Sequence, residues 1–336
     1  MTTVTDILGE VRHQIDAERE PLVEARARLA LVREAASGYH GALRTYASGS
    51  LAVHTMNHPV TDGDGGLVLD RRYYPRLGPD GGGEAPGDVV DDLCGVIGAI
   101  IRQDYPEARI YQSKRGPMVR FNAPVNDQDP TVDLVVALTR KEGGGLWIPN
   151  LKKNKWEPSD PEGHVALLNS GSPSHRSLRR QAIRLAKAWN KQYSQPGISS
   201  LMLSVWAYEF IIAGMGLDEG LHALLDGAAE RLAAHKSTPD PAGVSADLKL
   251  LLPEDSVQRR LRHAADALAA AIEIDGDEDA VRSALADLFW KYIADPGVSE
   301  LAHAASALSQ RKPISAAALG LNSVGTIIPP TRSFGV

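Results

Sequence analysis

The sequence predicts an α+β fold in which a mixed-sheet domain comes first and an α-helical lobe follows. Strand-like patterns occupy the first part of the chain and helical patterns the second. Between them, the glycines at 143–145 and Pro149 interrupt both patterns. The chain has 336 residues, 43% of them apolar, which is enough for two hydrophobic cores. We therefore expect a core domain over 1–150, a helical lobe over 151–321 and a flexible C-terminal tail over 322–336.

The first domain begins with residues 3–36, whose helical pattern Pro21 divides into two segments. We expect this region to form a long helix laid across the back of the sheet. Strand-like sequence starts near Leu43, and apolar residues recur at helical spacing over 88–103. Extended runs are expected at 109–112, 118–121 and 131–138.

Helical spacing of apolar residues then recurs through the second part of the chain. Helices are expected over residues 160–169, 174–192, 198–214, 218–235, 256–273, 278–293 and 298–310. Residues 322–336 are rich in Pro, Ser, Thr and Gly, which is typical of an exposed or disordered end.

The composition excludes several classes of protein. A formal net charge of −6 argues against a surface built to lie along extended nucleic acid or an anionic membrane. Cys94 is the only cysteine, so neither an intramolecular disulfide nor a cysteine-based zinc site is expected. The amino terminus lacks the basic and apolar blocks of a signal peptide, and the longest apolar window, residues 201–215, is too short to span a bilayer. We therefore expect a cytoplasmic protein with no membrane partner.

One glycine-rich stretch carries the first candidate site residues. Gly49-Ser50 forms a small-residue turn whose backbone and hydroxyl can approach a phosphate. Asp62 and Asp64 stand one residue apart, so in a strand their side chains point to the same face. Two carboxylates held together repel each other unless a cation lies between them. The pattern suggests a site for a metal-chelated nucleoside triphosphate, although Asp-Gly is also common in ordinary polar turns.

A third carboxylate lies in a later apolar strand. Asp133 is surrounded by apolar residues, where a charge without a partner is costly. If its strand lies beside the strand of Asp62 and Asp64, the three acids converge and can hold two Mg²⁺ (or Mn²⁺) ions for in-line phosphoryl displacement. Asp62 and Asp64 would then hold the triphosphate-bound metal. Asp133 would help to hold the second metal and to activate the attacking hydroxyl.

This combination of a Gly-Ser turn, an Asp-x-Asp pair and a later strand acid resembles the polymerase-β-like nucleotidyltransferases. Within that superfamily the chain most resembles the bacterial CD-NTases, relatives of cyclic GMP–AMP synthase that act in cyclic-oligonucleotide antiphage (CBASS) systems. The closer similarity lies in Leu146–Pro149, Trp156–His164 and Ile183–Asn190. The resemblance covers residues 40–215 and implies a nucleotidyltransferase core with a mixed sheet, followed by an α-helical lobe.

The resemblance also implies two further nucleotide-binding residues. Lys187 lies on the expected helix 174–192, one face of which is basic, and the family places a lysine here against the triphosphate. We expect the other cations of that face to be solvated. In the family a serine at the start of the next helix reaches the nucleotide, which matches Ser200 better than Ser199. Leu201 replaces the aromatic residue with which relatives stack on the base, so the base preference stays open.

The function implied by the resemblance is synthesis of a cyclic di- or trinucleotide second messenger from nucleoside triphosphates. ATP and/or GTP are the expected substrates, with UTP and CTP also open, and the product is expected to activate a separate antiphage effector. A template-independent RNA or tRNA terminal nucleotidyltransferase shares the three acids but needs a broad basic surface, which the acidity of this chain disfavours. A catalytically degenerate nucleotide-binding regulator is disfavoured because all three acids are present.

Some systems of this kind couple the C-terminus of the transferase to other molecules through a ubiquitin-like ligation partner. A flexible tail such as 329–336 would suit that coupling, and a simple disordered end is the alternative.

Overall fold

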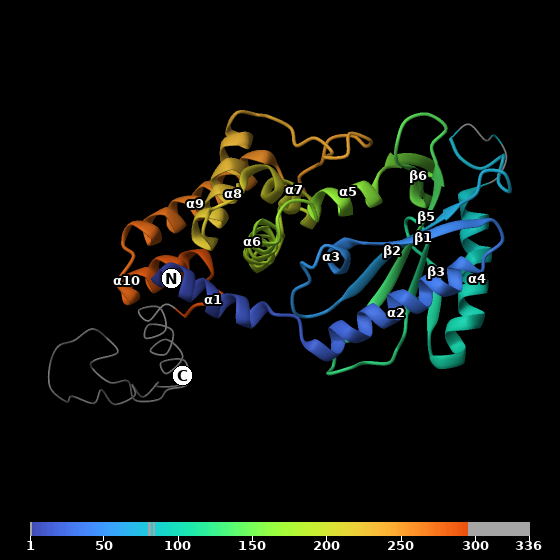
Figure 1. The fold of residues 1–336 in the computed structure, drawn as a ribbon, viewed down its shortest axis with the longest axis horizontal. Coiled ribbons are helices and arrows are strands. Elements are labelled where there is room, and N and C mark those ends of the chain that lie inside the picture. The colour runs from blue at the N-terminus through green and yellow to red at the C-terminus, as the bar shows by residue number, and fades with distance from the viewer. Residues whose placement is uncertain (1, 80–81, 83–84, 295–336) are drawn as a thin grey trace, which may run out of the picture.

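The computed structural model describes residues 2–79, 82 and 85–294, arranged as in Figure 1. The helix expected over 298–310 and the tail over 322–336 lie outside the described residues. Two large hydrophobic cores form, one around a sheet and one among helices. The expected helices between residues 160 and 293 are confirmed as α5 (Pro161–Leu168), α6 (Pro173–Gln192), α7 (Ser200–Phe210), α8 (Leu217–Ala233), α9 (Glu254–Glu273) and α10 (Glu278–Leu288).

A seven-stranded mixed sheet organises the first core. Its main path runs β1 (Ala42–Ser48), β2 (Asp62–Leu69), β5 (Thr131–Thr139), β4 (Pro117–Arg120) and β3 (Arg109–Gln112). β2 and β5 are parallel, and the other pairs are antiparallel. The strands expected from the sequence are therefore confirmed, and the glycine-rich β2 lies between two other strands rather than at an edge.

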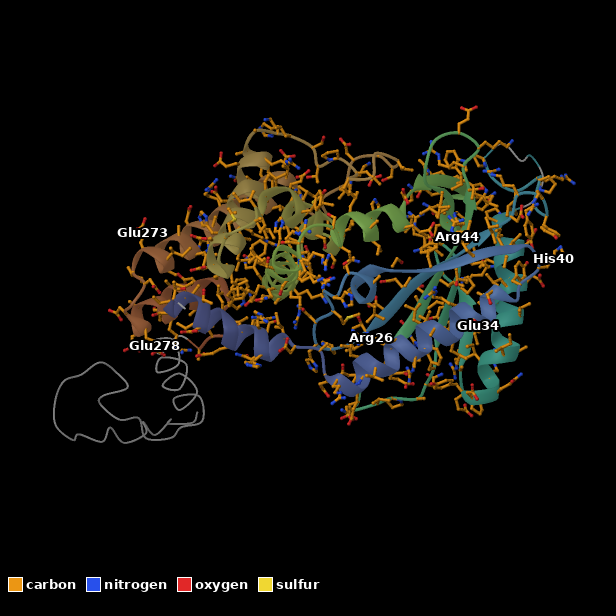
Figure 2. The ribbon with its side chains drawn as sticks, viewed as in Figure 1. Arg26, Glu34, His40, Arg44, Glu273 and Glu278 are labelled. Carbon is orange, nitrogen blue, oxygen red and sulfur yellow. The ribbon has the colours of Figure 1, made fainter. Side chains whose placement is uncertain are left out.

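The two faces of the sheet have different neighbours because side chains alternate along each strand. One face carries the apolar side chains of β2 and β5, such as Leu67 and Leu134, against α2 (Arg19–Ser37) and α4 (Pro86–Asp104). Figure 2 marks α2 by Arg26 and Glu34, and the helix runs along the sheet. The acids of β2 and β5 alternate with these apolar residues, so they point to the opposite face.

The glycines of β2 make room for neighbouring side chains. A Cβ on Gly63 or Gly65 would come within 3.3 Å of Leu29 on α2. A Cβ on Gly66 would overlap the ring of Tyr46, which lies over this part of the strand. The glycines therefore let one helix and one tyrosine approach the backbone on either side of the sheet.

The N-terminal segment forms two helices that belong to different cores. α1 (Thr3–Ile15) and α2 are separated as the sequence predicts. The expectation of one helix across the back of the sheet is correct for α2 and wrong for α1. The apolar stripe of α1, from Val4 to Ile15, is buried against α6, α8 and α10, because the short linker at 16–18 carries the chain from one core to the other. We call α1 and α6–α10 the helical lobe.

The sheet extends beyond residue 150, where only helices were expected. β6 (Leu146–Asn150) pairs with both β5 and β7 (Lys155–Ser159), which makes a hairpin. The β7 sequence Lys-Trp-Glu-Pro-Ser has no alternating apolar pattern, so its pairing with β6 defines it as a strand. A division at 150/151 would therefore cut this hairpin.

No helix among the described residues is both long and apolar enough to cross a bilayer.

Candidate active site

Backbone pairing brings the three predicted acids together. The parallel register of β2 and β5 sets Asp64 directly beside Asp133. Asp62 lies two residues before Asp64 on β2, so its side chain is on the same face of the sheet. The strand of Asp133 therefore lies beside the strand of Asp62 and Asp64, which is the arrangement predicted from the sequence.

Burial and neighbouring carboxylates raise the pKa values of Asp64 and Asp133. Burial, together with the negative charges of Asp62 and Asp133, raises the pKa of Asp64 to about 7, and the charge of Lys187 opposes this rise. Burial also raises the pKa of Asp133, with a hydrogen bond from Ser113 opposing it. Ionisation of Asp64 and Asp133 is therefore disfavoured unless a cation binds beside them.

This donor set fits divalent cations such as Mg²⁺ or Mn²⁺. Carboxylate oxygens are the ligands that such hard cations prefer. A cation bound beside Asp64 would oppose the effects of burial and of the neighbouring acids that raise its pKa. In the part of the chain that the structure describes, no three Asp, Glu, His or Cys side chains already form a metal ligand set. Binding would therefore need the acid side chains to turn toward one another on a backbone already in register.

Gly49 lies against the acids. Its φ of +63° favours glycine, and a Cβ built on it would fall 1.8 Å from Asp64 Oδ2. Gly49 begins the short helix α3 (Gly49–Ala52), immediately after β1, whose last residue pairs with Asp64. The Gly-Ser segment is thus held in contact with the carboxylate, as a phosphate-binding turn beside a metal site requires.

Lys187 reaches the same region from the helical lobe. Its side chain is only 6% exposed, and its Nζ donates to the carbonyl of Thr55 at 2.9 Å. The backbone N–H of Thr55 in turn donates to the carbonyl of Ser50 at 2.9 Å. Burial, with a smaller contribution from Lys191, lowers the pKa of Lys187 to about 8, and attraction to Asp62 and Asp64 opposes the change.

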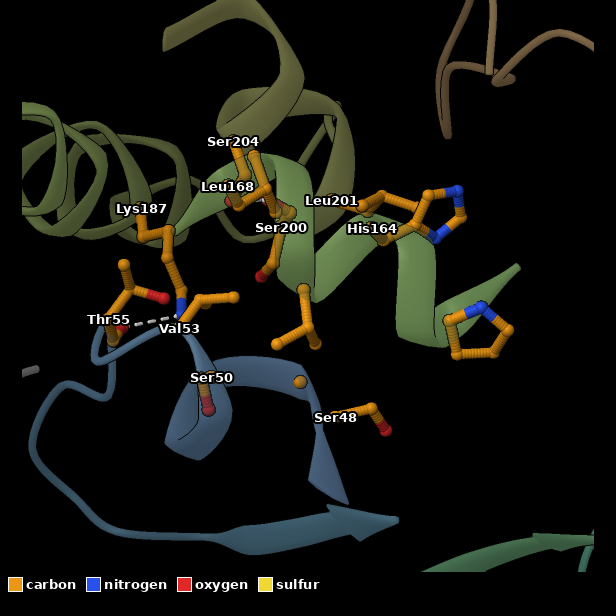
Figure 3. Close-up of a pocket in the computed structure, with 13 residues that line it drawn as sticks. Ser48, Ser50, Val53, Thr55, His164, Leu168, Lys187, Ser200, Leu201 and Ser204 are labelled. Atoms are coloured by element: carbon orange, nitrogen blue, oxygen red, sulfur yellow. Dashed lines mark hydrogen bonds between the residues drawn. The ribbon is translucent and has the colours of Figure 1, made fainter. Parts of the chain in front are cut away.

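A cavity of about 210 Å³ gathers the predicted nucleotide-binding residues (Figure 3). Gly49 and Ser50 line one side, while Lys187 and Ser200 come from the helical lobe. The remaining wall is largely aliphatic, formed by Val53, Pro161, Val165, Leu168 and Leu201. An aliphatic slot beside a phosphate-binding turn suits a nucleoside.

The structure separates the two candidate serines. Ser199 caps α7 by accepting the N–H of Met202 on its hydroxyl, at 3.2 Å. Ser200 is the first residue of α7 and lines the cavity, as does Leu201. Ser200 is therefore the serine available to a ligand.

The basic face of α6 is less solvated than expected. Arg184 donates to Asn57 Oδ1 at 3.1 Å and to Asp16 at 2.5 Å, which ties α6 to the linker between α1 and α2. Arg180 donates to Asn169 Oδ1 at 2.9 Å. Arg180 and Arg184 make structural contacts between the helical lobe and its neighbours, so the expectation of solvated side chains is wrong for these two, whereas Lys191 is exposed.

Sequence reasoning did not single out two residues that border the site. His164 lines the cavity, and its Nε2 lies 2.5 Å from the buried Asp240, which precedes α9 in the chain. Ser113 lines a second cavity of about 240 Å³ together with Asp64 and Asp133. Asp240 and His164 are 76 positions apart in the chain, so no local sequence pattern indicates that they pair.

The chain was compared with families, curated proteins and solved structures. No family model and no curated protein matches it. Solved structures do match over most of its length. The CD-NTase CdnG of Bradyrhizobium diazoefficiens, in complex with GTP, is 16% identical with a TM-score of 0.63, over 84% of this chain and 94% of that one.

Two further structures match similarly. CdnC of E. coli MS115-1 with ATP is 16% identical with a TM-score of 0.64, over 88% of this chain and 99% of that one. The DncV cyclic AMP-GMP synthase of Vibrio cholerae, in complex with a linear intermediate, is 15% identical with a TM-score of 0.54, over 87% and 88%. The α+β, polymerase-β-like architecture predicted from the sequence is confirmed, and this chain has the fold of the bacterial CD-NTases.

Proposed function

We propose that the protein is a metal-dependent nucleotidyltransferase that makes a cyclic di- or trinucleotide from nucleoside triphosphates. The observation that carries the proposal is the pairing of Asp64 with Asp133 across parallel strands, with the Gly49 backbone against the Asp64 carboxylate. Gly49, Ser50 and Lys187 line one cavity, Asp64 and Asp133 line a second, and Gly49 lies against Asp64 where the two approach each other. This proximity supports the proposal.

The similar structures support nucleotides as substrates. Those of CdnG and CdnC contain GTP and ATP, and DncV is a cyclic AMP-GMP synthase. We propose ATP and/or GTP for this chain, with UTP and CTP also to be tested. Ser200 and Ser204 of α7 both line the cavity, and the Ser204 hydroxyl already donates to the carbonyl of Ser200 at 2.9 Å. Base selection there would therefore depend on few hydrogen bonds.

The proposed reaction assigns a role to each residue. Gly49, Ser50, Lys187 and Ser200 bind the triphosphate of the donor nucleotide, and Asp62 and Asp64 hold its metal ion. When bound, divalent ions neutralise phosphate charge and lower the pKa of an attacking hydroxyl.

The bond changes then follow an in-line displacement. The 3′-oxygen of an acceptor nucleotide forms a bond to the α-phosphorus of the donor, the α–β phosphoanhydride bond breaks, and pyrophosphate leaves. Asp133 accepts the hydroxyl proton. For a dinucleotide, a second and intramolecular displacement on the linear product closes the ring and releases a second pyrophosphate. A trinucleotide needs one more intermolecular displacement before ring closure, and so releases three.

The test is incubation of the purified protein with radiolabelled nucleoside triphosphates and Mg²⁺ or Mn²⁺, without RNA. Small products that resist alkaline phosphatase are expected, because a cyclic product has no terminal phosphate. Asp62→Ala and Asp64→Ala should abolish them, whereas Asp247→Ala, at an exposed loop position, should not. Full product formation by the first two variants would refute the assignment.

The same assay separates the alternatives. Labelling that depends on added RNA would identify a terminal nucleotidyltransferase instead. Nucleotide binding without any product would identify a regulator. Mass spectrometry and nuclease mapping of a product would give its bases, ring size and linkage.

The biological role extends this proposal. We propose that the product is a second messenger that activates a separate antiphage effector, as in CBASS systems, and that the C-terminal tail can be joined to a ubiquitin-like ligation partner. Effector activation by the purified product tests the first. Mass spectrometry of the protein from its native host tests the second, and an unmodified C-terminus in the presence of the partner genes would contradict it.

A further inference from the structure

Helix α5 forms one wall of the nucleotide cavity, and side-chain contacts fix both of its ends. Near its start, Glu162 forms a bidentate ion pair with Arg44 on β1, at 3.1 and 2.7 Å. Just after its last residue, Asn169 Nδ2 donates to the carbonyl of Ala52 in α3 at 3.1 Å. A side chain that α5 turns into the cavity is therefore carried by a wall attached to the sheet and to the Gly-Ser helix.

His164 is the side chain of α5 that brings ring nitrogens to this wall. Its Nε2 lies 2.5 Å from Oδ1 of Asp240, whose side chain is fully buried. The backbone N–H groups of Val244 and Ser245 donate to the same carboxylate, at 3.0 and 2.7 Å, so it is held independently of His164. Burial alone would raise the pKa of Asp240, but its hydrogen bonds hold the pKa at about 2. An ionised carboxylate can only accept hydrogen bonds, so Nε2 carries the hydrogen and donates it.

The second ring nitrogen, Nδ1, is available to a ligand. His164 lines the cavity, and in the part of the chain that the structure describes Nδ1 has no hydrogen-bond partner. In Figure 3 one ring nitrogen of His164 points up, and the other points down toward the side of the cavity where Ser48 lies. With the hydrogen on Nε2, the neutral ring leaves a lone pair on Nδ1, which can accept a hydrogen bond.

The position of His164 in the cavity matches that expected for a base. Lys187 lies on the left of the view in Figure 3, beside Thr55, whereas His164 lies on the right. Aliphatic side chains such as Val165 and Leu168 supply much of the remaining wall. A nucleotide whose triphosphate is bound at Lys187 would therefore extend its base toward His164.

We propose that His164 determines which bases the protein accepts, by accepting a hydrogen bond from an exocyclic amino group of the donor nucleobase. This inference rests on the proposed function and deepens it. Adenine, guanine and cytosine carry such an amino group, whereas uracil does not. A base without the amino group would leave a largely buried acceptor unpaired, and would bind more weakly for that reason. Asp240 is then a positioning residue, because it sets the tautomer and the orientation of the ring.

Two substitutions separate base recognition from a purely structural role of His164. The side-chain nitrogen of glutamine falls near the position of Nε2, so His164→Gln keeps the bond to Asp240 but loses the acceptor. The side-chain amide of asparagine falls near the position of Nδ1, so His164→Asn keeps an acceptor but loses the bond to Asp240. The matched control is His263→Gln, at an exposed position of α9.

Binding is measured by calorimetric titration with α,β-methylene analogues, which cannot release pyrophosphate. The analogues form three pairs: ATP and purine riboside triphosphate, GTP and inosine triphosphate, and CTP and UTP. In at least one pair, the wild type and His263→Gln should bind the member with the amino group about tenfold more tightly. His164→Gln should bring this ratio to within about twofold of one at an unchanged melting temperature. His164→Asn should keep most of the ratio at a lowered melting temperature.

A second measurement does not depend on any variant folding. In the wild type labelled with ¹⁵N-histidine, the Nδ1 resonance of His164 should move when the member with the amino group binds, and should move less with the other member of that pair.

The inference is overturned if the wild type discriminates within no pair, if His164→Gln keeps the wild-type ratio, or if the Nδ1 resonance responds equally to both members. Tighter binding of the members that lack the amino group would also overturn it, because the ring would then be a donor. In each of these cases the analogues still bind and products still form, so the proposed function survives. Failure to bind any of the six analogues would instead contradict the proposed function itself.

Discussion

At the scale of single residues, the site is defined by how little space surrounds Asp64. The Gly49 backbone occupies one side of the carboxylate, and the other acids and Lys187 set its charge. Substitutions here should therefore affect function without breaking the fold.

Gly49→Ala is the sharpest steric test. The new Cβ would meet Asp64 Oδ2 at 1.8 Å, and the φ of +63° disfavours alanine, so the turn and the carboxylate must move apart. We expect product formation to fall by at least about 100-fold, as for other misplacements near 1 Å. Gly95→Ala on α4 is the matched control, because its Cβ would meet nothing within 4 Å. It should keep full activity and gain about 0.5–1 kcal/mol of stability.

Asp64→Asn should lose function but raise the melting temperature of the metal-free protein above neutral pH. Because the pKa of Asp64 is raised to about 7, its ionisation costs folding free energy that is absent below pH 4 and fully present above pH 7. Without metal, the variant should melt at a higher temperature than the wild type at pH 8, and the difference should vanish as the pH falls toward 4. It should also lose the stabilisation by Mg²⁺ that the wild type shows. Equal melting temperatures at pH 8 would mean that burial and the neighbouring acids do not oppose the ionisation of Asp64 as described.

At the scale of elements, a long loop between α8 and α9 supports one wall of the nucleotide cavity. The segment before α9 carries Asp240, which accepts the N–H groups of Val244 and Ser245 at 3.0 and 2.7 Å and contacts His164 on α5. Burial alone would raise the pKa of Asp240, but these hydrogen bonds outweigh it and hold the pKa at about 2. The ionised Asp240 carboxylate therefore holds α5, which carries His164 in the cavity wall, against the loop before α9.

Asp240→Asn tests this fastening through its pH dependence. The lowered pKa contributes stability that is present above pH 5 and lost as the pH falls toward 2. The variant should be less stable than the wild type by about 2 kcal/mol at pH 7, and the gap should narrow below pH 4. Urea denaturation at several pH values measures it, with the exposed Asp247→Asn as control. A gap that is constant with pH would show that the charge is not what stabilises the loop.

Some site residues and strands could be predicted from the sequence, and others could not. Asp62, Asp64 and Asp133 were found because an acid within an apolar strand stands out locally, and Gly49-Ser50 because small residues mark a turn. Lys187 looked like its basic neighbours and was distinguished by resemblance alone. Ser113 and Asp240 gave no signal. The place of Ser113 in a cavity with Asp64 and Asp133, and the contact of Asp240 with His164, arise only when distant chain segments come together on folding. β7 was missed because its strand character comes from pairing.

At the scale of the whole molecule, the two cores divide the N-terminal helices between them. Leu8 on α1 is buried among the helices of the helical lobe, whereas Leu29 on α2 is buried against the sheet. The assignment of both helices to the sheet failed because the amphipathic pattern of a helix shows that it packs, but not on what.

Leu8→Ala and Leu29→Ala form a matched pair that tests this division. Each should destabilise the protein by about 2–5 kcal/mol, because each opens a cavity in a packed core. Hydrogen exchange should accelerate in α6, α8 and α10 for Leu8→Ala, and in β2 and β5 for Leu29→Ala. If both variants loosened the same amides, the two cores would be one cooperative unit.

The chain passes between the sheet and the helical lobe twice, at residues 16–18 and again where β7 leads through α5 to α6. In Figure 1 these crossings lie on either side of α3. Lys187 adds a third tie between these parts of the chain, because its Nζ donates to the carbonyl of Thr55 at 2.9 Å. Lys187 and Ser200 come from the helical lobe, whereas Gly49 lies against Asp64 on the sheet. The width of the nucleotide cavity is therefore set by how the two cores pack against each other, and a substitution far from the cavity that shifts this packing would change it.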